Sequence, residues 1–252
     1  IDITAPSLAA TTLVPSLTND NTPNYTFSSN EAGTITYGGN CSSSTTAAAA
    51  DNNTITFNAL GDAQHANCNI TVRDNAGNTS STLDVNSFTI DTTAPSLSQV
   101  TAVPTPDNDS TPSYTFSSTE AGVITYSGGC GSSSSSARSG NNAVILTQSD
   151  NSTALSDGTY NCTIRVTDNA SNTSNALSVT QFIIDTTGPT VAEVTAVTTP
   201  GNDTTPRYIF SSNEAGNITY GGSCSSSTSA ASASDNTIDF NTLSVASYGD
   251  CT

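Results

Sequence analysis

The chain of 252 residues contains the same stretch of sequence three times, and this repetition limits the fold more than any other feature. The hexapeptide IDITAP at 1–6 returns as IDTTAP at 90–95 and as IDTTGP at 184–189, so that a repeat begins every 89 to 94 residues. A solenoid or propeller repeat takes only about 20–50 residues, whereas a period near 90 suits a small domain with its own core. We therefore predict three tandem domains, at 1–89, 90–183 and 184–252.

The third repeat ends at Cys251-Thr252, whereas repeats 1 and 2 continue beyond their second cysteine for another turn and strand. We expect an incomplete third domain that lacks its final strands, in a chain cut from a longer protein.

Apolar residues alternate with Thr within each repeat, as in Tyr25-Thr26-Phe27 and Ile35-Thr36-Tyr37. Alternation with period two is typical of half-buried strands, and clusters of Asn, Asp, Gly and Pro separate these segments as turns. The strands expected in repeat 1, besides the stretch after Pro6, are 25–29, 34–38, 54–59, 68–73 and 83–90. Six or seven short strands in some 90 residues predict an all-β fold of tandem immunoglobulin-like sandwiches, without helices.

Six cysteines occur as two per repeat: Cys41 and Cys68, Cys130 and Cys162, Cys224 and Cys251. In the predicted sandwich the strands at 34–38 and 68–73 are antiparallel neighbours, which brings Cys41 and Cys68 together. We predict one disulfide in each domain and an oxidising compartment. A metal site is the competing interpretation, but the pairs lack the CxxC spacing and histidine partners of zinc sites.

The residues before the second cysteine differ between repeats. Tyr160 lies two residues before Cys162, the position of a tyrosine corner, whereas Ala66 and Gly249 occupy that position in the other repeats. We therefore expect the corner in repeat 2 alone. The single histidine, His65, has no counterpart in the other repeats.

Composition excludes several classes of function. The net charge is −17 and the four basic residues are all Arg, which argues against nucleic-acid binding. No apolar run approaches the roughly 20 residues of a membrane span. One histidine, no lysine and no recurring nucleophile–base pair leave no basis for catalysis. We predict neither an enzyme, nor nucleic-acid binding, nor membrane insertion in this segment.

The linker IDTTAP, the segment EAGTITYGG and the segment TVRDNAGNTS resemble the bacterial immunoglobulin-like repeats of very large surface proteins and adhesins. The resemblance covers all three repeats. It implies an extracellular or cell-surface stalk, filament or adhesin in which the domains act as spacers, some of which bind calcium between neighbours. Partners implied are the neighbouring domains of the same long chain.

Acidic residues recur at fixed places. On the predicted sandwich, one set falls at the pole where the chain enters each domain: Asp2, Asp91 and Asp185 in the linkers, and Glu31, Glu120, Glu214, Asp74 and Asp168 in turns. Another set falls at the opposite pole: Asp20, Asp62, Asp109 and Asp157. Domains strung head to tail bring opposite poles together. The first junction would gather Asp20, Asp62, Asp91, Glu120, Asp168 and Asn169, and the second would gather Asp109, Asp157, Asp185 and Glu214.

Two interpretations of these acidic junctions stay open. Oxygen donors in such numbers suit Ca²⁺, which takes 6–8 oxygen ligands. Without a cation, carboxylates within a Debye length of about 8–10 Å would repel one another. Calcium would therefore stiffen a flexible linker. The alternative is that Asp, Asn and Gly occur here because they form good turns and keep the array soluble.

Two hypotheses of function follow. The first is a structural segment that works through its length and stiffness, with homopolymer formation or lateral self-association as a variant. The second is a module that binds carbohydrate, ice or a neighbouring protomer through its Thr-rich sheet faces or through the loop that carries five extra residues in repeat 2, around 150–154. A scarcity of exposed aromatic platforms counts against the second hypothesis.

Overall fold

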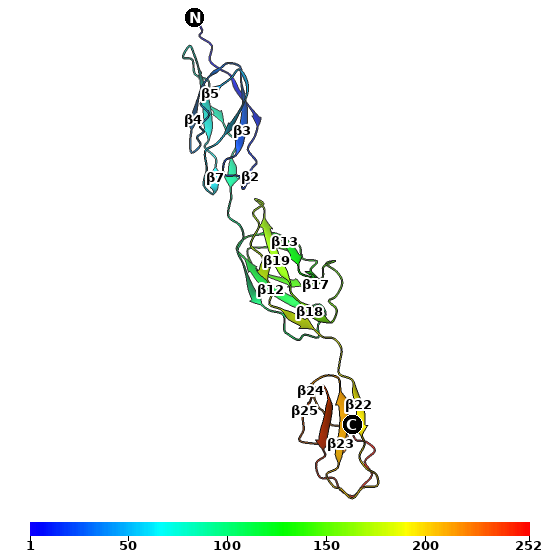
Figure 1. Cartoon of the computed structure of the whole chain (residues 1–252). Helices are drawn as coiled ribbons and strands as arrows, with labels where there is room; N and C mark the ends of the chain where they lie inside the picture. The colour runs from blue at the N-terminus through cyan, green and yellow to red at the C-terminus, as the bar shows by residue number, and fades with distance from the viewer. The chain divides into compact units, whose positions relative to one another are not determined.

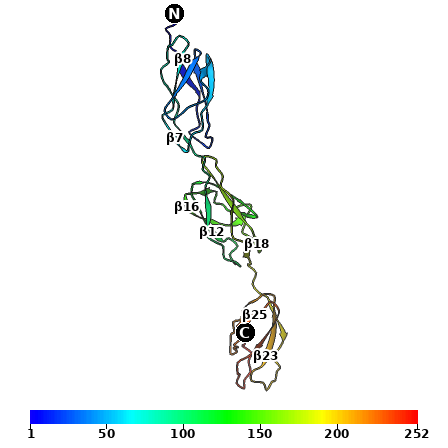
Figure 2. The same ribbon diagram turned by 60° about the vertical axis from the view of Figure 1, so that its left-hand side comes forward.

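The computed structural model describes all residues from Ile1 to Thr252, and every regular element in it is a strand. The chain divides into two compact units, Ile1–Asp185, which holds repeats 1 and 2, and Thr186–Thr252, which holds repeat 3. The strands of each repeat are shown in Figure 1, and Figure 2 shows them from another side. The chain contains no helix of the length and apolarity that a membrane crossing requires.

Repeat 1 is built from two main sheets and one small one. The first sheet has the order β1 (Leu8–Thr12), β3 (Asn24–Ser29), β6 (Asp51–Thr56), and the second has the order β5 (Ala47–Ala48), β4 (Gly33–Gly38), β8 (Asn69–Asp74), β9 (Leu83–Asp84). The small sheet has the order β2 (Leu17–Thr18), β10 (Phe88–Ile90), β7 (Ala63–His65), with β2 parallel to β10.

The core of repeat 1 comes from the residues that alternate inward along these strands. Tyr25 and Phe27 of β3, Ile55 of β6 and Ile70 of β8 are fully buried, and the Thr residues between them face outward or are half-buried. The same alternation recurs in repeat 2, where Tyr114 and Phe116 take the places of Tyr25 and Phe27. The predicted class of tandem all-β sandwiches is confirmed.

Two predicted strands differ from the observed ones. The strand expected at 54–59 is β6 at Asp51–Thr56, because it pairs along the whole of β3 from Asn24↔Thr56 to Ser29↔Asp51. The strand expected at 83–90 is divided into β9, which pairs with β8, and β10, which pairs with β7 and β2. Asn86 lies at the division, where its side chain bonds both backbone groups of Val14.

Repeat 2 has the same plan with one addition, and the counterpart of β2 is reduced to a single parallel bridge, Asp107↔Ile184. Its strands are β11 (Leu97–Thr101), β12 (Ser113–Ser118), β13 (Gly122–Ser127), β14 (Cys130–Gly131), β15 (Ser136–Ala137), β16 (Gly140–Ile145), β17 (Thr147–Gln148), β18 (Gly158–Tyr160), β19 (Thr163–Asp168), β20 (Leu177–Ser178) and β21 (Phe182–Ile184). The addition is the two-stranded sheet β14–β17, from which the five extra residues extend as an ordered loop. Asp150 closes that loop by accepting hydrogen bonds from the backbone of Ser152 and Thr153.

Repeat 3 forms the second compact unit. Its strands are β22 (Val191–Thr195), β23 (Arg207–Ser212), β24 (Gly216–Asn217), β25 (Ala230–Ala231) and β26 (Asp235–Asp239). The order β22-β23-β26 matches the first sheet of the other repeats, and β24 pairs with β25 as β4 pairs with β5.

Each repeat has one disulfide, as predicted: Cys41–Cys68, Cys130–Cys162 and Cys224–Cys251. The Cα atoms of these pairs are 5.2, 5.6 and 5.2 Å apart, within the usual range for a disulfide. No cysteine is free.

The expectation of a tyrosine corner in repeat 2 alone is wrong. The Tyr160 hydroxyl donates to the Ser156 carbonyl at 2.9 Å, and in repeat 3 the Tyr248 hydroxyl donates to the Ser244 carbonyl at 2.7 Å. In repeat 1, Nε2 of His65 lies 3.0 Å from the Gly61 carbonyl. His65 therefore does have counterparts. The comparison by sequence missed them because repeat 2 has one residue fewer between the corner residue and its cysteine.

Candidate metal centre

Three carboxylates meet where the chain enters repeat 2. Asp91 lies in the linker just after β10, Glu120 in the turn between β12 and β13, and Asp168 at the end of β19. One carboxylate oxygen from each lies within 4.8 Å of those of the other two. These segments are far apart in sequence, and the antiparallel pairing of β13 with β19, which begins at Gly122↔Asp168, brings their ends together.

Hydrogen bonds to the backbone hold the acidic turns in place. The Ser118 hydroxyl donates to the Glu120 carbonyl at 2.6 Å and accepts from the Glu120 N–H at 3.3 Å. The backbone and side-chain N–H groups of Asn172 each donate to the Asp168 carboxylate at 2.9 Å. The Asn172 side chain also donates to the Asp91 carbonyl at 2.8 Å, which ties the linker to the same turn.

The proximity of the three carboxylates disfavours negative charge on Glu120. Its pKa is raised, first by partial desolvation and then by the charges of Asp91 and Asp168. Asp168 is buried, with 8% of its surface exposed. No arginine forms an ion pair with any of the three groups. The negative charges of the three carboxylates are therefore not balanced by a basic side chain. A bound cation would balance them.

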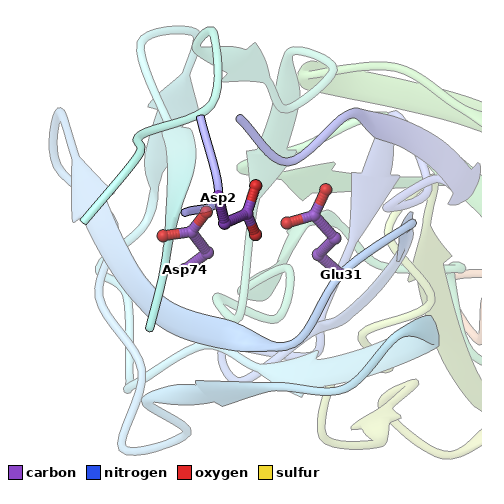
Figure 3. A group of neighbouring side chains, drawn as sticks. All are labelled: Asp2, Glu31 and Asp74. Atoms are coloured by element: carbon purple, nitrogen blue, oxygen red, sulfur yellow. The ribbon is translucent and has the colours of Figure 1, made fainter. Parts of the chain in front are cut away.

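Repeat 1 has an equivalent cluster, formed by Asp2, Glu31 and Asp74, whose carboxylate oxygens also lie within 4.8 Å of one another. Figure 3 shows the carboxylates of Asp74 and Glu31 on either side of that of Asp2. Asn78 donates to the Asp74 carboxylate from its backbone and side chain, both at 2.8 Å, and to the Asp2 carbonyl at 3.2 Å. The Asn78 side chain is the main reason that the pKa of Asp74 is lowered.

Of the carboxylates in the first predicted junction, Asp20 and Asp62 are not in the group formed by Asp91, Glu120 and Asp168. Asp20 accepts hydrogen bonds from the backbone and hydroxyl of Thr22 in its own turn. Asp62 accepts hydrogen bonds from the linker residues Thr92 and Thr93. Asn169 follows Asp168 at the tip of the turn. These positions leave Asp91, Glu120 and Asp168 as the convergent set.

The residues of the second predicted junction belong to two separate units. Asp109 accepts hydrogen bonds from the backbone and hydroxyl of Thr111, as Asp20 does from Thr22. The Asp185 N–H donates to the Asp107 carbonyl at 2.9 Å. Asp157 precedes β18 in the first unit, and in the second unit the Ser212 hydroxyl holds the backbone of Glu214 as Ser118 holds that of Glu120. A metal ion at this junction stays a prediction.

Chemically, the cluster at repeat 2 offers only hard oxygen ligands, without histidine or cysteine. Such donors suit Ca²⁺ and Mg²⁺ rather than zinc or copper. Ca²⁺ tolerates irregular geometry and takes 6–8 oxygens, so three carboxylates would form part of its shell, with waters or carbonyl oxygens completing it. The residues present therefore fit a calcium ion better than any transition metal.

The fold defines a class: tandem immunoglobulin-like sandwiches with acidic turns at their entry poles. A family model described as "Bacterial Ig-like domain" matches residues 4–92 and 101–186, more than half of the chain. The chain belongs to the bacterial Ig-like domain family. No curated protein matches it. Among solved structures, the "D00-D0 domain of Intimin" is similar at 16% identity and a TM-score of 0.33, over 69% of this chain and 98% of that one.

Proposed function

We propose that this chain is a structural repeat segment of an extracellular stalk, filament or adhesin on a bacterial surface, in which the domains act as spacers and calcium stiffens the junction between them. Membership of the bacterial Ig-like family, the tandem order of the repeats and one disulfide per repeat support this proposal. Disulfides persist in oxidising compartments such as the cell surface. The partners are neighbouring domains of the same chain.

The observation that carries the calcium part of the proposal is the convergence of Asp91, Glu120 and Asp168. Asp91 belongs to the linker, whereas the other two carboxylates belong to turns of repeat 2. A cation bound by all three would cross-link the linker to the domain that follows it. In its absence the three charges repel one another over less than a Debye length.

A calcium titration of the full chain by calorimetry tests this site. Each of the two clusters should account for one binding event, so we expect Glu120→Gln or Glu31→Gln to lose one event of the wild type and the double variant to lose both. Glutamine keeps the size of the side chain and removes its charge. Asp84→Asn is the matched control, because Asp84 is exposed on β9 and lies outside both clusters. Unchanged binding in the double variant would contradict the proposal.

A second candidate function rests on a pocket that only repeat 2 has the residues to build. The extra loop of this repeat, with Ser149 and Asn151, lines an open depression of about 250 Å³ together with β13 and the serine-rich segment after β14. Its lining carries hydroxyl and amide groups beside Ile124 and Cys130, and no charged residue, which suits a small neutral carbohydrate. A glycan array screen against the full chain and against a variant with residues 150–154 removed tests it; signal that is equal in both would exclude this pocket.

A further inference from the structure

The linker between repeats 1 and 2 is short, and its residues form hydrogen bonds with both repeats. Ile90, the residue at which repeat 2 is predicted to begin, packs in the core of repeat 1 with 1% of its surface exposed, and Pro95 is the next buried residue. Four residues, 91–94, lie between them. The hydrogen bonds and backbone restrictions of these four residues decide whether the linker can move freely.

On the side of repeat 1, Asp62 binds two successive linker residues. Its Oδ1 accepts from the Thr92 N–H at 3.1 Å and from the Thr92 hydroxyl at 2.8 Å, and its Oδ2 accepts from the Thr93 hydroxyl at 2.8 Å. These bonds lower the pKa of Asp62, and the bond from the Thr93 hydroxyl contributes most. The carboxylate is therefore ionised at neutral pH, where it accepts such bonds most strongly.

The position of Asp62 follows from the fold. Strands β7 and β10 are antiparallel, and their pairing ends at Ala63↔Ile90. Asp62, just before β7, therefore lies beside Asp91, just after β10. The bond between His65 and the Gly61 carbonyl closes the backbone around Asp62. The Asp91 N–H continues the ladder on the other side by donating to the Thr18 carbonyl at 3.0 Å.

Repeat 2 holds the other side of the linker. The Asn172 side chain donates to the Asp91 carbonyl at 2.8 Å. Ala94 precedes Pro95, and a residue before proline is restricted to extended conformations. Ser96 then exchanges hydrogen bonds with Thr119 of the following turn. Every residue from 91 to 94 is thus bonded or sterically limited by protein groups alone.

We infer that residues 91–94 form a brace between repeats 1 and 2 that works without metal, with Asp62 as its positioning residue. The inference deepens the spacer role proposed above and does not depend on calcium. Calcium at Asp91, Glu120 and Asp168 would add to a linker that is already restrained. Asp62 contributes no oxygen to that cluster, so the two contributions can be separated by substitution.

The test is amide hydrogen exchange measured by NMR on the full chain with excess chelator. In the wild type we expect the Thr92 amide to be protected. In Asp62→Ala its exchange should be about tenfold faster, as expected for the loss of a charge-assisted hydrogen bond. Asp84→Ala removes an exposed aspartate of the same repeat and should match the wild type. The Thr89 amide, bonded to the Ser16 carbonyl, reports whether repeat 1 remains folded.

A Thr92 amide that exchanges freely in the wild type, or equally in Asp62→Ala and Asp84→Ala, would overturn the inference. Glu120→Gln separates it from the calcium proposal. That variant should lose its response to calcium at this junction and keep Thr92 protected in chelator. If calcium binds nowhere and Asp62→Ala still releases Thr92, the brace stands and the calcium proposal fails.

Discussion

At the scale of single residues, one structural role is filled by different side chains. His65, Tyr160 and Tyr248 each bond the carbonyl four residues earlier, and so fix the chain just before the second cysteine of each repeat. His65 also stacks on Phe88 and Tyr160 on Phe182, with ring centroids 5.3 and 5.5 Å apart. The buried Nδ1 atom of His65 has no hydrogen-bond partner, a cost that the tyrosines avoid.

Exchange of the corner residue tests this equivalence. We expect His65→Tyr to keep or raise the stability of repeat 1, because Tyr248 makes the corner bond at the same spacing from its cysteine. His65→Ala should lower the free energy of unfolding by about 2–3 kcal/mol, through a cavity and an unpaired carbonyl. Calorimetric unfolding of the full chain measures both. Equal losses in the two variants would show that the tyrosine does not replace the histidine.

Gly39 is required by its backbone and its surroundings. Its φ is +72°, and a Cβ atom there would lie 1.9 Å from the carbonyl oxygen of Asn67. Gly39→Ala should therefore destabilise repeat 1 by roughly 1–3 kcal/mol from backbone strain, and by more if the contact cannot relax. Gly61→Ala is the control, since a Cβ atom there meets nothing within 4 Å. A Gly39→Ala variant as stable as Gly61→Ala would refute this account.

At the scale of elements, the disulfide joins the segment after β4 to the start of β8, two strands that are already paired. It closes 27 residues of chain, which is worth about 3–4 kcal/mol in the chain-entropy model. We expect a Cys41→Ser, Cys68→Ser double variant to unfold at a lower temperature while repeat 2 is unaffected. A calorimetric transition of repeat 1 that does not move would contradict the expected contribution.

The acidic turns predict an unusual pH dependence. Because the pKa of Glu120 is raised, its charged form is disfavoured in the folded state, so the stability of this turn is lost as pH rises through that pKa and regained on acidification. In chelator, amide protection in the turn at 119–121 should increase from pH 7 towards its ordinary pKa of 4.5. Glu120→Gln should abolish the trend. Amide protection at 119–121 that decreases in the wild type as the pH falls over this interval would contradict the prediction.

The sequence predicted those parts of the fold that depend on local patterns of residues. Alternation of Tyr, Phe and Ile with Thr located β3, β4 and β8 to within a residue, and the recurrence of cysteines predicted the pairings. It did not reveal the division into β9 and β10, because the bond from Asn86 to Val14 joins residues 72 positions apart. The role of Asp62 was missed for a similar reason: its partners become visible only once the register of β7 and β10 is known.

At the scale of the molecule, three repeats follow one another along the chain through short linkers. Repeats 1 and 2 lie in one compact unit and repeat 3 in another. The brace proposed at 91–94 and calcium at the carboxylate cluster beside it would act on the same linker by different means. If both contribute, removing calcium should increase the mobility of the linker only in part, and Asp62→Ala should increase it further.

The most direct test of the central claim is small-angle X-ray scattering of the full chain, with saturating calcium and with chelator at equal ionic strength. We expect a larger maximum dimension and a narrower distance distribution with calcium, and a smaller change in the Glu31→Gln, Glu120→Gln double variant. Identical scattering curves with and without calcium in the wild type would contradict the claim that calcium stiffens these junctions.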